Sequence, residues 1–351
     1  TRILKQGEVQ GSDVAAHGVG VVDIKTSILP EADALFLTVI DKYGYELWRW
    51  TFPVEKLNQQ SEPISFLSIR PTYTETENDL IVKANKRTFI FSKKDGQLKG
   101  VSVDNRKISF ANGPRFIGAR RADRSLDQFY NHDDEKAKEK DRTYSEFPDA
   151  AVFTKLDVKE DGGNLVVTAN YKLGNLDKTQ WTINPSGELA LDYTYNFSGV
   201  VDLMGIRFDY PEDQVISKRW LGAGPYRVWQ NRIHGTQYDV WENDYNDPIP
   251  GETFTYPEFK GYFGDVSWMN IQTKEGTISL TNETPDAYIG VYQPRDGRDR
   301  LLYTLPESGI SVLNVIPPVR NKVNSTDLCG PSSQPKWVNG PQTGRVIFRF
   351  M

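Results

Sequence analysis

Aromatic and hydrogen-bonding side chains gather most densely between residues 220 and 262. Sugar rings are bound by aromatic faces that pack on their C–H groups and by forked polar groups that hold their hydroxyls. If residues 226–231 form a strand, Arg227, Trp229 and Asn231 point to one side and together suit a pyranose. The segment therefore predicts carbohydrate contact by eight residues: Tyr226, Arg227, Trp229, Asn231, Arg232, Trp241, Tyr256 and Glu258.

The same residue types have a second interpretation, because aromatic side chains also fill sandwich cores and the seams between domains. Trp220 is the strongest candidate for the core, since Leu221 and Gly222 beside it are typical of a strand. Glu258 could hold its loop through a salt bridge instead of binding a sugar hydroxyl. If Arg227 faced the core, its charge would be costly to bury without a partner.

Catalytic carboxylates are not evident in the sequence. Glycoside hydrolysis usually needs two carboxyl groups, about 5–5.5 Å apart when the configuration is retained. Asn282-Glu283 is the only Asn-Glu pair, and it lies where a predicted strand leaves into a turn. We therefore interpret the pair as a chance dipeptide and predict no catalytic residue.

The sequence also shows no residue pattern typical of a metal or cofactor site. The three histidines, His17, His132 and His234, do not pair at the spacing of metal ligands, and the acidic residues after His132 are typical of an exposed charged loop. Gly222-Ala-Gly224-Pro lacks the third glycine and the lysine of a phosphate-binding loop. The sequence predicts no metal and no cofactor.

Composition limits the classes of partner. The chain has 351 residues and a net charge of −5, so it lacks the basic excess of a nucleic-acid-binding protein. It has no apolar run near 18 residues, which argues against a membrane-spanning segment. Cys329 is the only cysteine, so no internal disulfide is expected, as is usual in the cytoplasm and common in a bacterial periplasm. Since residue 1 is Thr, a removed signal and a fragment of a longer protein both remain open.

The periodicity along the chain is that of strands. Apolar residues alternate with more polar ones over residues 165–171 and again over 189–197, as in half-buried strands. Asn184-Pro-Ser-Gly187 and Asp95-Gly96 supply turn residues for two predicted hairpins. Many short strands with turns between them predict an all-β chain with sandwich packing.

A domain boundary is predicted where apolar periodicity weakens, between residues 58 and 78. Before this linker, residues 20–24, 35–40 and 45–54 predict three strands, which are too few for a seven-stranded sandwich. We therefore assign residues 1–57 to a partial immunoglobulin-like β segment and residues 79–351 to a large β domain.

Several motifs occur in an order that resembles the last domain of bacterial β-galactosidases of glycoside hydrolase family 2. Residues 89–98 and Gly113-Pro-Arg-Phe116 resemble its start, followed by Arg121-Ala-Asp123. Trp220-Leu-Gly-Ala-Gly-Pro-Tyr226 resembles its Trp-Leu-Gly-x-Gly-Pro motif, and Asn231-Arg232 and residues 256–262 follow as in the family. The first 55 residues are similar to the end of the preceding domain. The resemblance implies a large antiparallel supersandwich, similar to galactose mutarotase, that packs beside a catalytic (β/α)8 barrel and helps shape the sugar site.

One departure from the family concerns the substrate. Some β-galactosidases have a tryptophan that stacks on the sugar where this chain has Cys329, within residues 324–330. A thiol offers no aromatic face, so a sugar other than galactose is an open expectation.

The resemblance implies a non-catalytic, carbohydrate-facing C-terminal domain that completes a sugar cleft with the barrel, so carbohydrate and the barrel are the expected partners. An independent carbohydrate-binding module is one alternative. An aldose 1-epimerase-like enzyme is another, for which His234 and Glu258 are the only acid–base pair that we can nominate.

Overall fold

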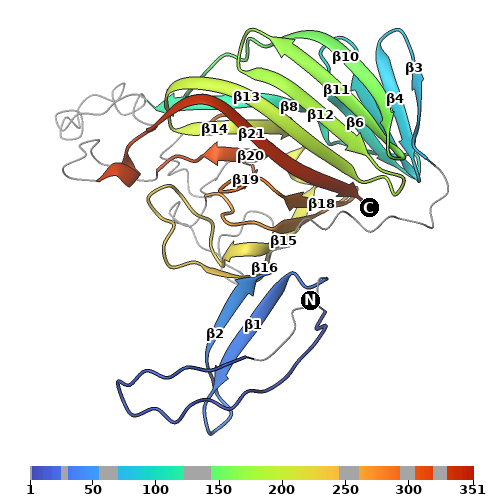
Figure 1. The fold of residues 1–351 in the computed structure, drawn as a ribbon. Coiled ribbons are helices and arrows are strands. Elements are labelled where there is room, and N and C mark those ends of the chain that lie inside the picture. The colour runs from blue at the N-terminus through green and yellow to red at the C-terminus, as the bar shows by residue number, and fades with distance from the viewer. Residues whose placement is uncertain are drawn as a thin grey trace. The chain divides into compact units, whose positions relative to one another are not determined.

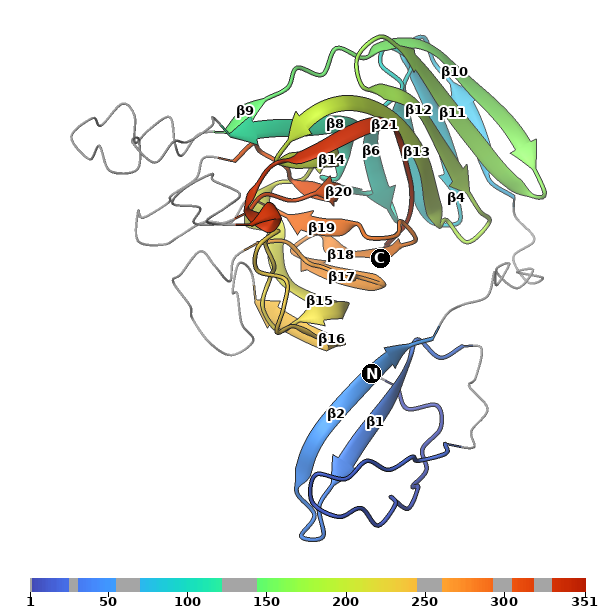
Figure 2. The same ribbon diagram turned by 60° about the vertical axis from the view of Figure 1, so that its left-hand side comes forward.

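The computed structural model describes residues 2–24, 31–54, 70–121, 144–244, 261–292, 305–318 and 330–351. The chain forms two compact units, Thr1–Pro63 and Ile64–Met351. Figures 1 and 2 show the strands of each unit from two directions. No helix in these described ranges is long and apolar enough to cross a membrane.

The described part of the first unit contains one antiparallel hairpin, β1 (Ala34–Ile40) and β2 (Glu46–Pro53). Its turn is held by the Asp41 carboxylate, which accepts hydrogen bonds from the backbone amides of Tyr43 and Tyr45. Residues 20–24 were predicted as a third strand, and that prediction is wrong: they pair with no other strand in the described part of the unit. The immunoglobulin-like assignment of this unit stays a prediction.

The second unit is built from two large antiparallel sheets. Within the described residues the first sheet has nine strands, and β13 and β21 near its centre run side by side although they are far apart in sequence (Figure 1). In spatial order its strands are β10 (Val152–Asp161), β11 (Asn164–Lys172), β12 (Leu176–Ile183), β13 (Leu189–Val201), β21 (Lys336–Phe350), β18 (Gly276–Asn282), β17 (Trp268–Thr273), β15 (Val215–Gly224) and β16 (Gln237–Asp244).

The second sheet has ten strands within the described residues. In spatial order these are β19 (Tyr288–Val291), β20 (Ile310–Val315), β14 (Leu203–Asp209), β8 (Ala111–Arg121), β6 (Leu98–Val103), β5 (Arg87–Ser92), β4 (Asp79–Ala84) and β3 (Thr72–Glu75), with β7 (Arg106–Ile108) beside β6 and β9 (Tyr144–Glu146) beside β8. Two short 3-10 helices, η1 (Glu212–Gln214) and η3 (Pro331–Ser333), lie outside the sheets. Strand β3 pairs with β4 and falls inside the range 58–78 assigned to a linker, so strand structure begins before residue 79.

Both predicted hairpins are confirmed. Residues 184–187 connect β12 to β13, and the Asn184 side chain accepts hydrogen bonds from the backbone amides of Ser186 and Glu188. Asp95 and Gly96 lie between β5 and β6, where Gly96 has a φ of +74°, a conformation that glycine adopts without steric cost. In each case the turn residues satisfy the backbone at the point where the chain reverses.

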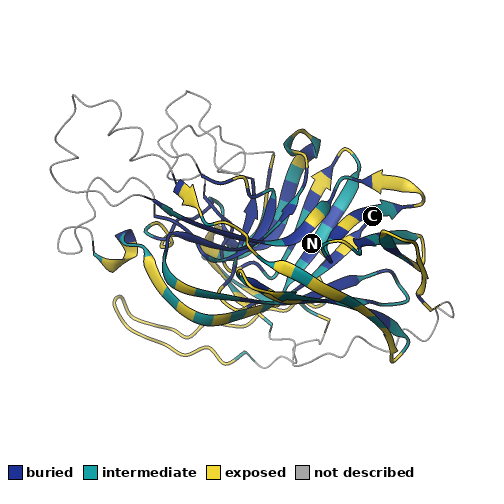
Figure 3. Cartoon of the chain, turned by 90° about the horizontal axis from the view of Figure 1, so that it is seen from above, coloured by how far each residue is buried: buried dark blue, intermediate teal, exposed yellow. Residues whose placement is uncertain are grey.

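The main core lies between the two sheets. Phe208 of the ten-stranded sheet packs against Phe348 and Trp181 of the nine-stranded sheet, with ring centroids 5.4 and 6.1 Å apart. Buried residues follow the strands of this unit in bands, as the dark blue segments of Figure 3 show. The all-β class and the sandwich packing predicted from the sequence are confirmed.

A second apolar cluster covers the opposite face of the ten-stranded sheet. Phe116 of β8 points into the main core, whereas the next residue, Ile117, belongs to this second cluster. Chain segments outside the sheet complete the cluster with Val228, Trp229 and Tyr262. The segment 226–232 is therefore anchored to the sheet by its own apolar side chains.

Candidate functional site

The predicted row of Arg227, Trp229 and Asn231 does not lie on a strand. Residues 225–236 contain only isolated bridges, in which Val228 pairs with Tyr262 and Trp229 with Arg232. Val228 and Trp229 are both 1% exposed, so neighbouring residues are buried together instead of alternating. Asn231 lies in the turn that follows and is half-buried.

Arg227 is also only 1% exposed, and it belongs to a buried cationic region around Phe263. The Arg227 guanidinium carbon and the Lys218 ammonium each lie 5.9 Å from the centre of the Phe263 ring, a distance at which a cation is attracted to an aromatic face. Burial raises the pKa of Tyr262, and the positive charge of Arg227 works against that rise.

Two of the predicted aromatic residues remain partly open to solvent: Tyr226, on the segment that connects β15 to β16, and Trp241, on β16 itself. The Tyr226 hydroxyl donates to the backbone oxygen of His234, and the Trp241 indole donates to the backbone oxygen of Gln237. Trp241 also packs on Gly224, where an added Cβ would lie 2.4 Å from the indole ring. Arg232 is exposed, so Tyr226, Asn231, Arg232 and Trp241 are the predicted contact residues that a dissolved sugar could reach.

The remaining residues singled out from the sequence are either buried, exposed or outside the described ranges. Trp220 is fully buried in the main core, as predicted. Tyr256 and Glu258 lie outside the described residues, as do Cys329 and His132. His234 is exposed, and its nominated epimerase partner is Glu258. No group of three or more potential metal ligands occurs within the described ranges.

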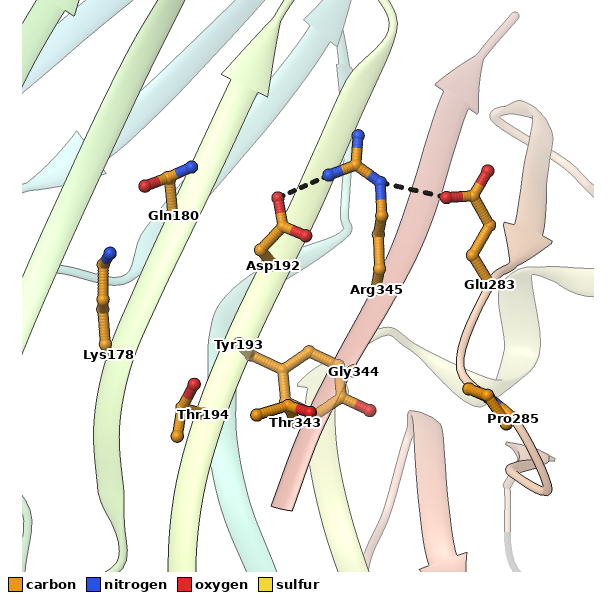
Figure 4. A pocket seen from close by; sticks show the side chains of 10 residues that line it. All are labelled: Lys178, Gln180, Asp192, Tyr193, Thr194, Glu283, Pro285, Thr343, Gly344 and Arg345. Atoms are coloured by element: carbon orange, nitrogen blue, oxygen red, sulfur yellow. Dashed lines mark hydrogen bonds and ion pairs between the residues drawn. The ribbon is translucent and has the colours of Figure 1, made fainter. Parts of the chain in front are cut away.

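The structure brings together a second set of polar residues on the face of the nine-stranded sheet that points away from the core (Figure 4). Gln180, Asp192 and Arg345 are direct neighbours across β12, β13 and β21. Two residues further along, Lys178, Thr194 and Thr343 form a parallel row across the same strands. With Glu283 and Pro285, which follow β18, these residues line a pocket of about 400 Å³.

Arg345 is the electrostatic centre of this pocket. Its Nη1 atom lies 2.6 Å from the Asp192 carboxylate, and its Nε atom lies 3.0 Å from the Glu283 carboxylate. Partial burial works to lower the pKa of Arg345, but the hydrogen bond and charge of Asp192, with Glu283, raise it above its ordinary value. The two carboxylates therefore hold a permanently charged guanidinium in one orientation.

Tyr193 lies at the base of the pocket beside Gly344, its partner across β13 and β21. Its side chain extends across β21 at Gly344 in Figure 4. The Thr284 hydroxyl, which donates to the Arg345 backbone oxygen and accepts from the Arg345 amide, lies close to the same glycine. Burial raises the pKa of Tyr193 to about 12, and Thr284 partly opposes that rise.

Sequence reasoning did not find this pocket. The alternation of residues 189–197 places Asp192 and Thr194 on the polar face of their strand, which is the one available signal. The pairing of β13 with β21 joins positions separated by about 150 residues, and such a register is not encoded in local periodicity.

Comparison with known proteins identifies the family. The family model described as β-galactosidase small chain matches residues 83–317, which is more than half of the chain. The chain belongs to the β-galactosidase small-chain family. The resemblance predicted from the motifs is thereby confirmed, and this family relates the chain to sugar chemistry. Among curated proteins, none matches the chain.

Solved structures show more distant similarity. The galactose 1-epimerase from Lactobacillus acidophilus is 9% identical, with a TM-score of 0.45 over 81% of this chain and 99% of that one. An aldose epimerase homologue from C. elegans is 7% identical, with a TM-score of 0.38 over 80% and 99% of the two chains. A mutarotase-like protein from Salmonella typhimurium is 8% identical, with a TM-score of 0.35 over 80% and 93%. Similarity at these levels carries no inference about the activity of this chain.

Proposed function

We propose that this chain is the non-catalytic, carbohydrate-facing C-terminal part of a β-galactosidase-like hydrolase of family 2, and that it completes a sugar cleft with a catalytic barrel. The observation that carries the proposal is the family match over residues 83–317, which lie within the second unit. The large sandwich supports it, because a rigid sheet scaffold can present loops to a neighbouring domain.

In this proposal the partly or fully exposed members of the predicted sugar-binding residues contact the sugar, and the buried members hold the loop in place. Tyr226 and Trp241 offer partly open aromatic faces, and Asn231 and Arg232 offer hydrogen-bonding groups to sugar hydroxyls. Trp229 and Arg227 are buried and hold the loop on the second apolar cluster and beside Phe263. Tyr256 and Glu258 stay proposed contacts outside the described residues.

The non-catalytic role is supported by the state of the best-placed carboxylates. Asp192 and Glu283 both bind Arg345, so their charges are already engaged by a fixed cation. A pair working as acid and nucleophile needs different environments, with one carboxyl kept protonated. We therefore expect the purified chain to give no turnover of aryl β-galactosides or β-glucuronides above background. Turnover that survives repurification and disappears in Glu283→Gln would overturn this expectation.

The barrel partnership is tested by adding this chain to a separately purified polypeptide that carries a family 2 barrel from the same source. The expected result is a higher rate of aryl β-galactoside hydrolysis with the chain than without it, and a smaller increase with Trp241→Phe or Tyr226→Phe. Thr277→Val, on β18 and outside the segment that joins β15 to β16 (the 224–237 loop), serves as the matched control and should behave as the unmodified chain. An unchanged rate, together with saccharide binding through the 224–237 loop, would instead favour an independent carbohydrate-binding module.

A further inference from the structure

Six polar side chains form a regular grid on the outer face of the nine-stranded sheet. One row is Gln180, Asp192 and Arg345, and the adjacent row is Lys178, Thr194 and Thr343. Neighbouring strands are about 4.8 Å apart, and residues two apart on a strand are separated by about 6.8 Å. The grid therefore presents an amide, a carboxylate, a guanidinium, an ammonium and two hydroxyls. Their spacings are similar to the width of one monosaccharide ring.

Most of the grid keeps free hydrogen-bonding capacity. Among the described residues, the side chains of Lys178, Gln180, Thr194 and Thr343 make no hydrogen bond, although all four line the same pocket (Figure 4). Two pairs of polar side chains elsewhere on this face bond to each other. Ser279 donates to Asn270 over 2.6 Å, and Thr277 donates to Gln272 over 2.8 Å. The hydrogen-bonding groups of these two pairs are already used, whereas those of the four grid residues are open.

The charges at the grid indicate what it could bind. Lys178 and Arg345 are balanced by Asp192 and Glu283, so the pocket carries no net charge. An anion would lie against two carboxylates, and a cation would lie against an ammonium and a guanidinium. A neutral molecule with several hydroxyls avoids both costs, because each hydroxyl donates to a carboxylate or accepts from a cation.

We infer that this grid is a binding site for a neutral polyhydroxylated molecule of the size of one sugar unit. Its volume of about 400 Å³ lies in the range of small-molecule pockets. The ion pairs of Arg345 with Asp192 and Glu283 fix the central groups before the ligand arrives, and Pro285 adds an exposed apolar edge for ring C–H groups. This site is distinct from the 224–237 loop, and only the choice of galactose as probe below rests on the proposed function.

The experiment is a titration of the full chain with D-galactose, followed by saturation-transfer NMR of the sugar. Thr343→Val and Gln180→Leu each remove open hydrogen-bonding groups without disturbing the ion pairs. Each variant should weaken galactose binding about fivefold, as expected for one neutral hydrogen bond. Thr277→Val makes the same chemical change as Thr343→Val outside the pocket, and it should leave binding unchanged. Melting temperatures of all variants show whether each remains folded.

Two further comparisons make the outcome decisive. D-galacturonate and D-galactosamine, which carry a charge, should bind more weakly than D-galactose. Trp241→Phe changes a proposed sugar contact beside the 224–237 loop, so any signal that it removes belongs to that contact, and the part of the signal that Thr343→Val and Gln180→Leu reduce should remain. The inference is overturned if galactose gives no signal, if either charged sugar binds more tightly, or if folded Thr343→Val and Gln180→Leu variants bind as the unmodified chain does. Loss of signal in Trp241→Phe alone would overturn the grid and leave the proposed function standing.

Discussion

Gly344 of β21 lies directly opposite Tyr193 of β13, and a Cβ atom at residue 344 would lie 2.2 Å from the Tyr193 hydroxyl oxygen. The same Cβ would lie 2.7 Å from the Thr284 hydroxyl. Glycine at this position therefore gives Tyr193 and Thr284 the space they occupy beneath the polar pocket. The pocket and the packing below it depend on one residue that has no side chain.

Gly344→Ala should destabilise the second unit, because the new methyl group must displace a buried tyrosine ring. Overpacking of this kind typically costs about 1–3 kcal/mol, which would appear as a lower melting temperature. Gly100→Ala is the matched control, since an added Cβ there would meet nothing closer than 3.9 Å. Equal melting temperatures for the two variants would contradict the close contact between residues 344 and 193.

Stability at alkaline pH should depend on Tyr193. Burial raises its pKa from 10.0 to about 12, so the unfolded chain loses this proton at a lower pH than the folded one. The contribution of neutral Tyr193 to the free energy of unfolding is fully present below about pH 10. It is lost between about pH 10 and 12, and the loss is at most about 2.7 kcal/mol. Tyr193→Phe removes this part of the decline, so denaturant unfolding from pH 8 to 12 should show a flatter curve. Parallel curves for the two proteins would show that Tyr193 ionises equally in both states.

Substitutions of Trp229 and of Trp241 should have different effects, the first on stability and the second on sugar contact. Trp229 is 1% exposed within the second apolar cluster, so Trp229→Ala should cost about 3–5 kcal/mol of unfolding free energy. Trp241→Phe keeps an aromatic ring on Gly224 and should shift the melting temperature little. It should, however, reduce the increase in aryl β-galactoside hydrolysis that the chain gives to the barrel. Arg227→Ala should also lower stability. If Trp229→Ala and Arg227→Ala leave the melting temperature unchanged, the loop is not held as the burial of these residues indicates.

The second unit should fold without the first. Each strand pairing of the two large sheets lies within Ile64–Met351, whereas the described hairpin of the first unit leaves Trp48 and Trp50 exposed. Deleting residues 1–60 should therefore give a soluble product that keeps its β-sheet circular dichroism and unfolds cooperatively. An unfolded or aggregated product would place the boundary elsewhere.

Local sequence predicted the parts of the fold that local chemistry controls. The hairpin at residues 184–187 was recognisable because asparagine and glycine both favour a tight turn. The Asn184 side chain accepts hydrogen bonds from the backbone of the turn, and Gly187 ends it within four residues. Alternation over residues 189–197 predicted the buried positions Leu189, Leu191, Tyr193 and Tyr195 of β13. Residues 20–24 were also predicted as a strand, yet strand formation requires a neighbouring strand, and no local pattern supplies one.

By itself, the sequence determined the all-β class, the hairpins, the burial of Trp220 and the motifs that led to the β-galactosidase small-chain family. Only the tertiary structure decided that Trp229 is anchored in an apolar cluster and that Asp192 meets Arg345. The physical reason is the range of the interactions. Turn chemistry and alternation act over a few residues, whereas the register of β13 on β21 is set by packing between segments about 150 residues apart, and that register places Gln180, Asp192 and Arg345 in one row.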